Sequence, residues 1–314
     1  MTILIIGGAG FIGASLARKL TGAGETVVCM DTNVDPWHLG ETAAQVALVR
    51  GDAAQFDEVA APIADHKIKA VVNLAYVLSA ASEAHLHAGL RVNVLGMNNV
   101  FEAARIGGIK KVVYASSVAY HGANSGPEPT TITEESPANP LGVYGWQKQL
   151  NEVMAERYAV RHGMTMVAVR PPVVFGPGRR LGQIAHAAMI DQVALGRPYR
   201  MAASPDAKTA LIHVDDVADL FFRLVRAQDI RHRAYLTGGT VISNAELAAT
   251  IRGFIADADI AFDPPSELPP HFGLSFAYDH ARAKAEFGYE PPPLAERVRE
   301  TIAATRRLDG RPPP

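Results

Sequence analysis

Short apolar runs rich in β-branched residues alternate with amphipathic segments over the first half of the chain. Apolar runs of this length, bounded by turn residues, predict buried strands. Such strands are expected at 3–6, 26–31, 46–50, 70–74, 111–116 and 164–170. Helical spacing predicts helices at 11–20, 55–65, 84–105 and 143–162. This alternation predicts a Rossmann-type, doubly wound α/β fold, whose ligands bind at the carboxyl ends of the parallel strands.

A glycine-rich turn joins the first expected strand to the first expected helix. Gly8, Gly10 and Gly13 satisfy G-x-G-x-x-G, and Gly7, Gly10 and Gly13 satisfy G-x-x-G-x-x-G. Glycines let the backbone approach a pyrophosphate, and the following helix directs its amino-terminal N–H groups at the phosphates. A strand before and a helix after favour a dinucleotide site over a glycine turn without ligand. The residues expected at the phosphates are Gly7, Gly10, Phe11, Ile12 and Gly13.

Two aspartates follow the next strands. Asp31 ends the second strand, near the spacing of a ribose ligand. A carboxylate there accepts hydrogen bonds from the ribose and repels the extra phosphate of NADP, and no arginine follows it at 32–34. The expected cofactor is therefore NAD, with a cap or turn as the alternative role. Asp52 is expected near the adenine, with a turn aspartate as the alternative.

A tyrosine and a lysine lie four residues apart on the last expected helix, and therefore on one face. Tyrosine's ordinary pKa is near 10, too high for a base at neutral pH. An ammonium from Lys148 and a positive nicotinamide would lower the pKa of Tyr144, which then exchanges a proton with an alcohol or ketone. Ser117, at the end of the fifth strand, is placed to bind the same oxygen. The alternative is an amphipathic surface pair.

These pieces resemble an extended short-chain dehydrogenase/reductase of the NAD-dependent epimerase/dehydratase family over nearly the whole length. The matching segments are 6–13, Asp31, 51–52, 72–75, 93–96, 114–122, 144–148, 170–178 and 211–217. The resemblance implies that Ser117 rather than Ser116 is catalytic and that Lys148 also binds the nicotinamide ribose. It implies further cofactor contacts at Ala75, Asn93, Tyr144 and Pro171; a buried capping role is the alternative for Asn93.

The resemblance also implies a homodimer. In the family, the helices matching 84–105 and 143–162 pair across a two-fold axis as a four-helix bundle. The small or apolar residues expected there include Val100, Ala103, Ala104, Met154 and Ala155.

Departures from the family pattern bear on the substrate. Val118 and Ala119 follow Ser117, where dehydratases carry an acid. Val173 replaces an asparagine typical of sugar-nucleotide epimerases, and Thr209 replaces an arginine, although Lys208 lies beside it. These changes favour net hydride transfer between NAD and a small polar alcohol or ketone, of the sugar, sugar-acid or hydroxy-acid type. The alternatives are a sugar-nucleotide epimerase and a non-catalytic NAD-binding regulator.

Beyond Arg170 the regular pattern ends in proline-rich and glycine-rich segments. We expect an NAD-binding domain over 1–175, to which 209–240 returns, and a smaller mixed α/β substrate-binding lobe over 176–208 and 241–314. The candidate substrate contacts are His121, Val173, Arg179 and Arg180. For His121 the alternative is a loop histidine without a role, and for the two arginines it is solvation.

Composition adds little to this interpretation. The chain has 314 residues, 20% of them charged, and a net charge of −2, so nothing in its charge predicts nucleic acid or a membrane as partner. Residues 2–17 are apolar but lack a basic leader, which favours strand, loop and helix over a signal peptide. A single cysteine, Cys29, excludes an intrachain disulfide and a four-cysteine metal site, so no metal and a cytoplasmic location are expected.

Overall fold

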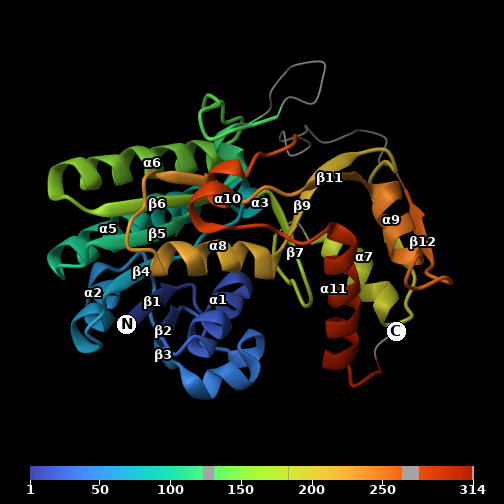
Figure 1. Ribbon diagram of the computed structural model, residues 1–314, viewed down its shortest axis with the longest axis horizontal. Coiled ribbons are helices and arrows are strands. Elements are labelled where there is room, and N and C mark those ends of the chain that lie inside the picture. The colour runs from blue at the N-terminus through green and yellow to red at the C-terminus, as the bar shows by residue number, and fades with distance from the viewer. Residues whose placement is uncertain (123–130, 183, 264–275, 313–314) are drawn as a thin grey trace.

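A computed structural model describes residues 1–122, 131–182, 184–263 and 276–312. Its largest sheet is parallel, with the strand order β10-β6-β5-β4-β1-β2-β3 (Figure 1). The strands are β1 Thr2–Ile6, β2 Thr26–Asp31, β3 Ala47–Arg50, β4 Ala70–Asn73, β5 Lys111–Ala115, β6 Thr165–Arg170 and β10 Ala234–Leu236. The Rossmann-type fold and the six predicted strands are confirmed. Strand order reverses between β1 and β4, which places the ligand crevice above their carboxyl ends.

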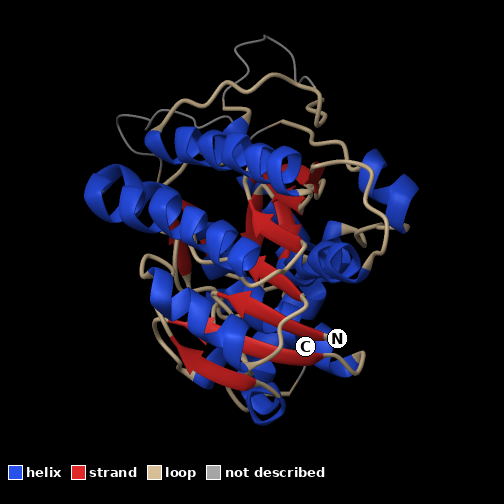
Figure 2. Ribbon diagram, turned by 90° about the vertical axis from the view of Figure 1, so that its left-hand side faces the viewer, coloured by secondary structure: helices blue, strands red, loops and turns tan. Residues whose placement is uncertain are grey.

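Helices cover both faces of this sheet (Figure 2). Alternate residues of β1 point to opposite faces: Ile3 and Ile5 pack with α1 and α8, whereas Leu4 and Ile6 pack with α2, α5 and α6. The covering helices are α1 Phe11–Gly22, α8 Val214–Arg226, α2 Phe56–Asp65, α5 Met97–Ile106 and α6 Val143–His162. A large apolar core on each face holds the sheet in place beneath the loops at its carboxyl edge.

The helix predicted over 84–105 is wrong in its extent. Helix α3 (Ser79–Ala84) begins earlier, and His85 leaves the helical region with φ −131° and ψ 72°. The chain continues through α4 (Leu86–Gly89) and the π-helical turn η3 (Leu90–Gly96) into α5. A Cβ on Gly89 would lie 2.5 Å from Ser82 Oγ, so the absence of a side chain at Gly89 lets α3 and α4 pack closely.

The smaller lobe is mixed α/β. Strands β7 (Val173–Phe175), β9 (Lys208–His213) and β11 (Thr240–Ser243) form one sheet, and β8 (Tyr199–Met201) pairs with β12 (Ile260–Phe262). Helices α7 (Ala185–Ala194), α9 (Asn244–Arg252) and α11 (Leu294–Leu308) pack around a separate apolar core.

The domain division stays a prediction, and three segments lie otherwise than it places them. Strands β7 and β9 belong to the small sheet, because they pair with each other and β9 pairs with β11. Helix α10 (Ala281–Phe287) packs on the main sheet through Ala283, not on the smaller lobe.

The residues named for the dimer interface are buried within the subunit. Val100 and Ala104 are fully buried, Ala103 and Ala155 are 2% exposed, and Met154 packs against the same core. They therefore stabilise the subunit itself. Within the described ranges, none of the helices combines the length and apolar character needed to cross a bilayer.

Candidate active site

The glycine loop packs tightly against β4. Gly7 has φ +80°, and a Cβ there would lie 2.9 Å from the backbone nitrogen of Ala75. A Cβ on Gly13 would lie 2.2 Å from the carbonyl oxygen of Gly7. Gly10 differs, because a Cβ there would meet only the Gly7 oxygen, at 3.2 Å. The room beside Gly10, at an α1 amino terminus with no side-chain cap, fits the approach of a dinucleotide pyrophosphate.

The two aspartates differ in their environment. Asp31 lies beside the glycine loop, where its carboxylate accepts hydrogen bonds from the backbone N–H groups of Ala9 (3.2 Å) and Asn33 (3.3 Å). Burial raises the pKa of Asp31 despite these bonds. Asp52 accepts from the N–H of Ala54 at 2.9 Å and pairs with Arg91 at 3.0 Å, which is the turn role.

Ser117, Tyr144 and Lys148 come together at the carboxyl end of β5. Tyr144 and Ser117 line one cavity, and the Ser117 hydroxyl accepts from the N–H of Ala119 at 3.1 Å. The Lys148 ammonium donates to the carbonyl of Ala115 at 2.6 Å. It lies 5.2 Å from the centroid of the Tyr144 ring. Two local causes produce this cluster: Ser117 lies two residues after the end of β5, and α6 carries the other two residues one turn apart.

Burial dominates the acid–base balance of the cluster. It raises the pKa of Tyr144 to about 12, although the Ser117 hydrogen bond and the Arg179 guanidinium act in the opposite direction. Burial also lowers the pKa of Lys148 well below its ordinary value. The expected lowering of the Tyr144 pKa is therefore not met in the chain alone, because desolvation outweighs the contributions of Ser117 and Arg179.

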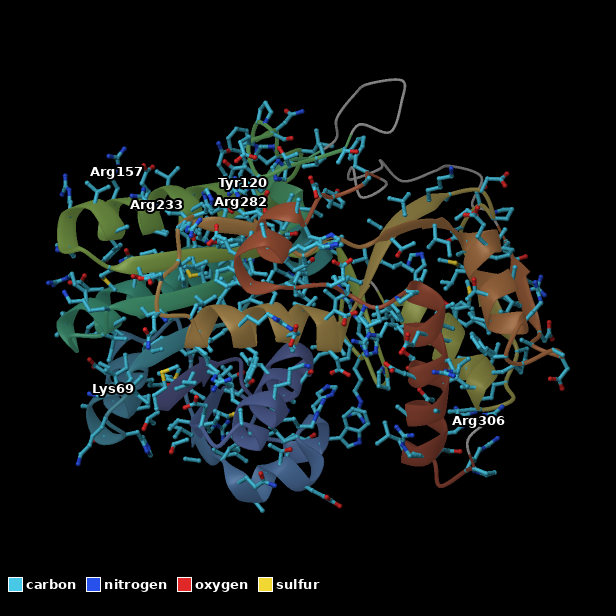
Figure 3. All side chains as sticks on the ribbon, viewed as in Figure 1. Lys69, Tyr120, Arg157, Arg233, Arg282 and Arg306 are labelled. Atoms are coloured by element: carbon cyan, nitrogen blue, oxygen red, sulfur yellow. The ribbon has the colours of Figure 1, made fainter. Side chains whose placement is uncertain are left out.

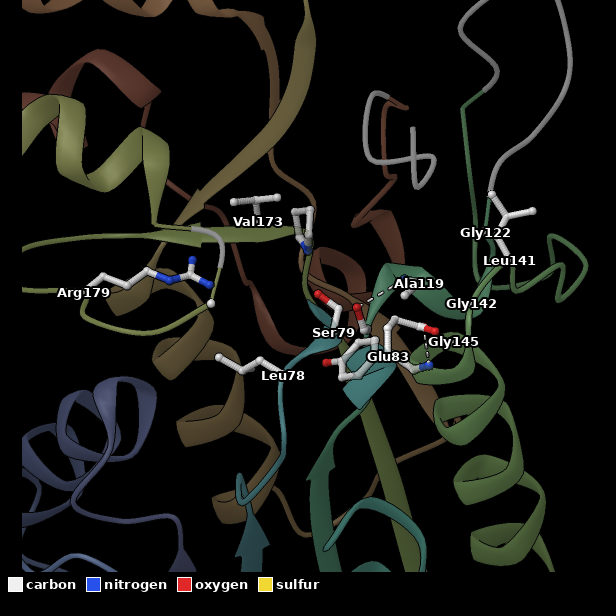
Figure 4. A pocket seen from close by; sticks show the side chains of 14 residues that line it. Leu78, Ser79, Glu83, Ala119, Gly122, Leu141, Gly142, Gly145, Val173 and Arg179 are labelled. Carbon is white, nitrogen blue, oxygen red and sulfur yellow. Dashed lines mark hydrogen bonds between the residues drawn. The ribbon is translucent and has the colours of Figure 1, made fainter. Parts of the chain in front are cut away.

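An open cavity adjoins this cluster. Its wall includes Ser117, Tyr144, Val173 and Arg179, so it joins the cluster to the loop after β7. Figure 4 shows Arg179 entering from the side opposite Glu83. A concave site in which a few polar groups converge among apolar residues is typical of a small-molecule site.

A model of the NAD dependent epimerase/dehydratase family matches residues 3–238. This chain belongs to that family. It is accordingly an enzyme with NAD as its cofactor, and the glycine loop fits that cofactor.

Relatives within the family have different activities. A UDP-glucose 4-epimerase of Mycolicibacterium smegmatis is 29% identical over 313 residues, covering 96% of this chain and 97% of the relative. A D-erythronate dehydrogenase of Cupriavidus necator is 32% identical over 186 residues, 55% of each chain. A solved L-threonine dehydrogenase of the same organism superposes with a TM-score of 0.85 at 25% identity, covering 96% of this chain and 99% of the other.

The four substrate candidates separate in space. Val173 and Arg179 lie on the cavity wall. His121 instead lies in a buried network, with its ring nitrogens 3.1 Å from Arg170 Nη1 and 3.3 Å from the Pro137 carbonyl oxygen. Both ring nitrogens of His121 thus have partners inside the protein, and His121 is not among the described residues that line the cavity.

Arg180 is also absent from the cavity wall. Its guanidinium stacks 3.7 Å from the ring centroid of Trp37, in the 3₁₀ turn Pro36–His38. The close packing of Gly178 against the same ring explains this position, since a Cβ on Gly178 would lie 2.3 Å from Trp37.

Three further residues that the family resemblance placed near the cofactor make contacts within the protein. Asn93 accepts from the N–H of Val77 at 2.8 Å and donates to its carbonyl at 2.9 Å and to Gln147 at 2.7 Å. This is the buried capping alternative. Ala75 lies against Gly7, and the Pro171 carbonyl accepts from the N–H of Val118 at 3.2 Å.

Sequence reasoning missed several residues of the site. Ser79 and Glu83 line the cavity from α3, and the Glu83 carboxylate accepts from the N–H of Tyr144 at 3.2 Å. No sequence signal identified them, because the helix was expected to begin at residue 84. Trp37 was missed as well, since only the fold brings it to the loop that holds Gly178.

Proposed function

We propose that this enzyme catalyses net hydride transfer between NAD and a carbinol or ketone carbon of a small polar substrate, of the sugar, sugar-acid or hydroxy-acid type. The composition of the cavity wall carries this proposal. It brings the Ser117–Tyr144 pair together with the apolar Val173, and Arg179 is the sole cation among its described residues. Two dehydrogenases of small polar acids, acting on D-erythronate and L-threonine, are among its relatives.

Each catalytic residue has a distinct task in the oxidation direction. Bound oxidised nicotinamide supplies a hydride acceptor and a positive charge. Ser117 orients the substrate hydroxyl, and Tyr144 as its phenolate takes the O–H proton while the carbon–oxygen double bond forms. Lys148 holds the ribose and adds positive charge near Tyr144. A reduction runs the same steps in reverse, with Tyr144 donating the proton.

The remaining cofactor contacts follow the geometry. We assign the pyrophosphate to the loop of Gly7, Gly10 and Gly13 and to the N–H groups of Phe11 and Ile12. We assign the adenosine ribose to Asp31, which favours NAD over NADP.

Sugar-nucleotide epimerisation is the second candidate, supported by the relative from Mycolicibacterium smegmatis over nearly the full chain. A diphosphate needs several cationic or N–H ligands. Lys208 is exposed and lies near Glu246 rather than on the cavity wall. Other cations, such as Lys69, Arg157 and Arg306, project from outer parts of the molecule (Figure 3). The segments 123–130 and 264–275 contain no lysine or arginine.

The test compares the two candidates directly. The enzyme with NAD is incubated with UDP-glucose, UDP-galactose or UDP-glucuronate, and the sugars are followed by NMR and NADH by absorbance. We expect no interconverted sugar. Rapid interconversion without accumulation of NADH identifies an epimerase and overturns the proposal.

We further propose a cytoplasmic homodimer formed through α6 and the helices before α5. Helix α6 exposes an apolar stripe at Trp146, Leu150, Val153 and Val160, of which Trp146 is 59% and Val160 64% exposed. Large apolar groups at this spacing on one helix face favour an isologous interface. Sedimentation at micromolar concentration is expected to give a dimer, and Val153→Glu a monomer; a monomeric wild type rejects this interface.

A further inference from the structure

Arg179 is a largely buried cation with unused hydrogen-bonding capacity. Its Nε donates to the carbonyl of Leu181 at 3.2 Å. Its Nη1 is enclosed, yet neither terminal nitrogen has a hydrogen-bond or acidic partner among the residues that the structure describes. A cation removed from water without a counter-ion costs stability. Its retention on a cavity wall therefore indicates an anionic ligand.

The groups around Arg179 do not neutralise it. Burial lowers the pKa of Arg179 to about 10, so the guanidinium is still charged at neutral pH. His186 lies close behind it, and burial lowers the pKa of that imidazole, which therefore adds no second charge. Glu83 is on the opposite side of the cavity and accepts from the N–H of Tyr144 (Figure 4).

The position of Arg179 relative to Ser117 and Tyr144 indicates which kind of ligand it binds. Arg179 and Tyr144 line one cavity, and their charges act on each other. The bond through Nε holds the guanidinium in place and leaves its terminal N–H groups without an acceptor among the described residues, and charged N–H donors of this kind bind a carboxylate. A molecule held there by one end presents its other end to Ser117 and Tyr144.

We propose that Arg179 binds the carboxylate of the substrate, and that this enzyme acts on hydroxy-acid anions. This inference rests on the proposed function. In the oxidation, the carbinol C–H leaves as hydride to NAD⁺, the O–H proton passes to Tyr144, and the C–O bond becomes C=O. The products are an oxo acid, NADH and one proton, and the carboxylate is unchanged throughout.

Matched pairs of probes test the charge directly. Lactate, glycerate, 3-hydroxybutyrate and gluconate are each compared with the corresponding amide, which keeps the shape and removes the charge. Binding to the enzyme–NADH complex is measured by calorimetry, and turnover with NAD by absorbance. For at least one pair, we expect the acid to bind at least tenfold more tightly than its amide, the scale of one charged hydrogen-bonded contact.

Variants assign the effect to one residue. Arg179→Gln is expected to abolish the preference for the acid, mainly through KM, and Arg179→Lys to keep part of it. Arg180→Gln is the matched control, because Arg180 stacks on Trp37 outside the cavity, and it should keep the full preference. The dissociation constant of NAD should stay unchanged in Arg179→Gln.

Three outcomes overturn the inference. The first is that no acid binds or turns over better than its amide in the wild type. The second is that Arg179→Gln retains the preference. The third is that Arg179→Gln weakens NAD alone, which would assign Arg179 to the cofactor phosphates near Phe11, whose ring centroid lies 6.0 Å away. Interconversion of UDP-sugars is a separate result, which refutes the proposed function instead.

Discussion

Arg170 is buried and Arg179 is partly buried, and the two guanidinium groups have opposite surroundings. Arg170 donates through Nε (2.9 Å) and Nη2 (2.6 Å) to the two carboxylate oxygens of Glu152. Its Nη1 contacts His121, and its guanidinium stacks 3.8 Å from the ring centroid of Tyr120. Within the part of the chain that the structure describes, Arg179 has one hydrogen bond, to a backbone carbonyl. Arg170 has hydrogen-bond partners within the protein and therefore stabilises the fold. Arg179 has terminal nitrogens without a partner among the described residues and therefore retains the capacity to bind a ligand.

The largest expected effect is the difference between the two arginines in their contribution to the free energy of unfolding. Arg170→Met leaves Glu152 buried without its partner and should lower the free energy of unfolding by about 3–5 kcal/mol. Arg179→Met removes an unpaired cation and should leave that free energy unchanged or raise it. Urea unfolding of both variants measures the difference. Equal losses in the two variants would show that Arg179 is a structural residue.

The next effect concerns the catalytic side of the cavity. Tyr144→Phe keeps the ring and removes the ionisable oxygen, so kcat should fall by roughly a hundredfold or more, the scale of a lost general base. Calorimetry should show nearly unchanged NAD binding. Activity within threefold of the wild type would assign the proton transfer to another group.

Lowering the pH should weaken the hydrogen-bond network that joins Arg170, Glu152 and His121. Burial and the charge of Arg170 lower the pKa of His121 to about 4, against 6.5 in the unfolded chain. Between these values the unfolded chain binds more protons, so the free energy of unfolding falls as pH falls from about 6.5 towards 4. At pH 5 this histidine alone should cost about 2 kcal/mol relative to high pH.

His121→Gln isolates that contribution, because glutamine keeps a donor and an acceptor and does not titrate. The difference in unfolding free energy between pH 7 and pH 5 should shrink by about 2 kcal/mol. Some slope should remain, since burial also lowers the pKa of His213 to about 4. An unchanged slope would mean that His121 does not couple folding to protonation.

The smallest expected effect concerns the affinity for NAD and the role of Asp31. Asp31→Ala removes the proposed ribose acceptor and should weaken NAD binding by about tenfold, the loss of one or two hydrogen bonds to a charged group. NADP binding should weaken less or improve, because a repelling carboxylate is removed. Dissociation constants from calorimetry decide this, and wild-type NADP binding as tight as NAD binding contradicts the role of Asp31.

The sequence predicted those parts of the site that depend on local order along the chain. The glycine turn and Ser117 adjoin strands, and Tyr144 and Lys148 share one helical face, so their relative positions follow from backbone geometry. The fold class followed from the same alternation of strands and helices. All six predicted strands are present in the structure.

Other features required knowledge of packing between distant segments. Neighbouring Arg179 and Arg180 look alike in the sequence, and only the approach of Trp37 to Gly178 separates their environments. His121 follows the catalytic serine closely, but its partner Arg170 comes from another strand. The break at His85 and the burial of Val100 depend likewise on neighbours that periodicity does not reveal.

The ratio of NADH formed to substrate consumed tests the central claim most directly. The enzyme is incubated with excess NAD and a panel of sugars, sugar acids and hydroxy acids, with NADH followed by absorbance and products by NMR. Net oxidation predicts one NADH for each molecule of ketone product, with hydroxy acids as the substrates. Conversion of a substrate into its epimer with no NADH released would contradict the account.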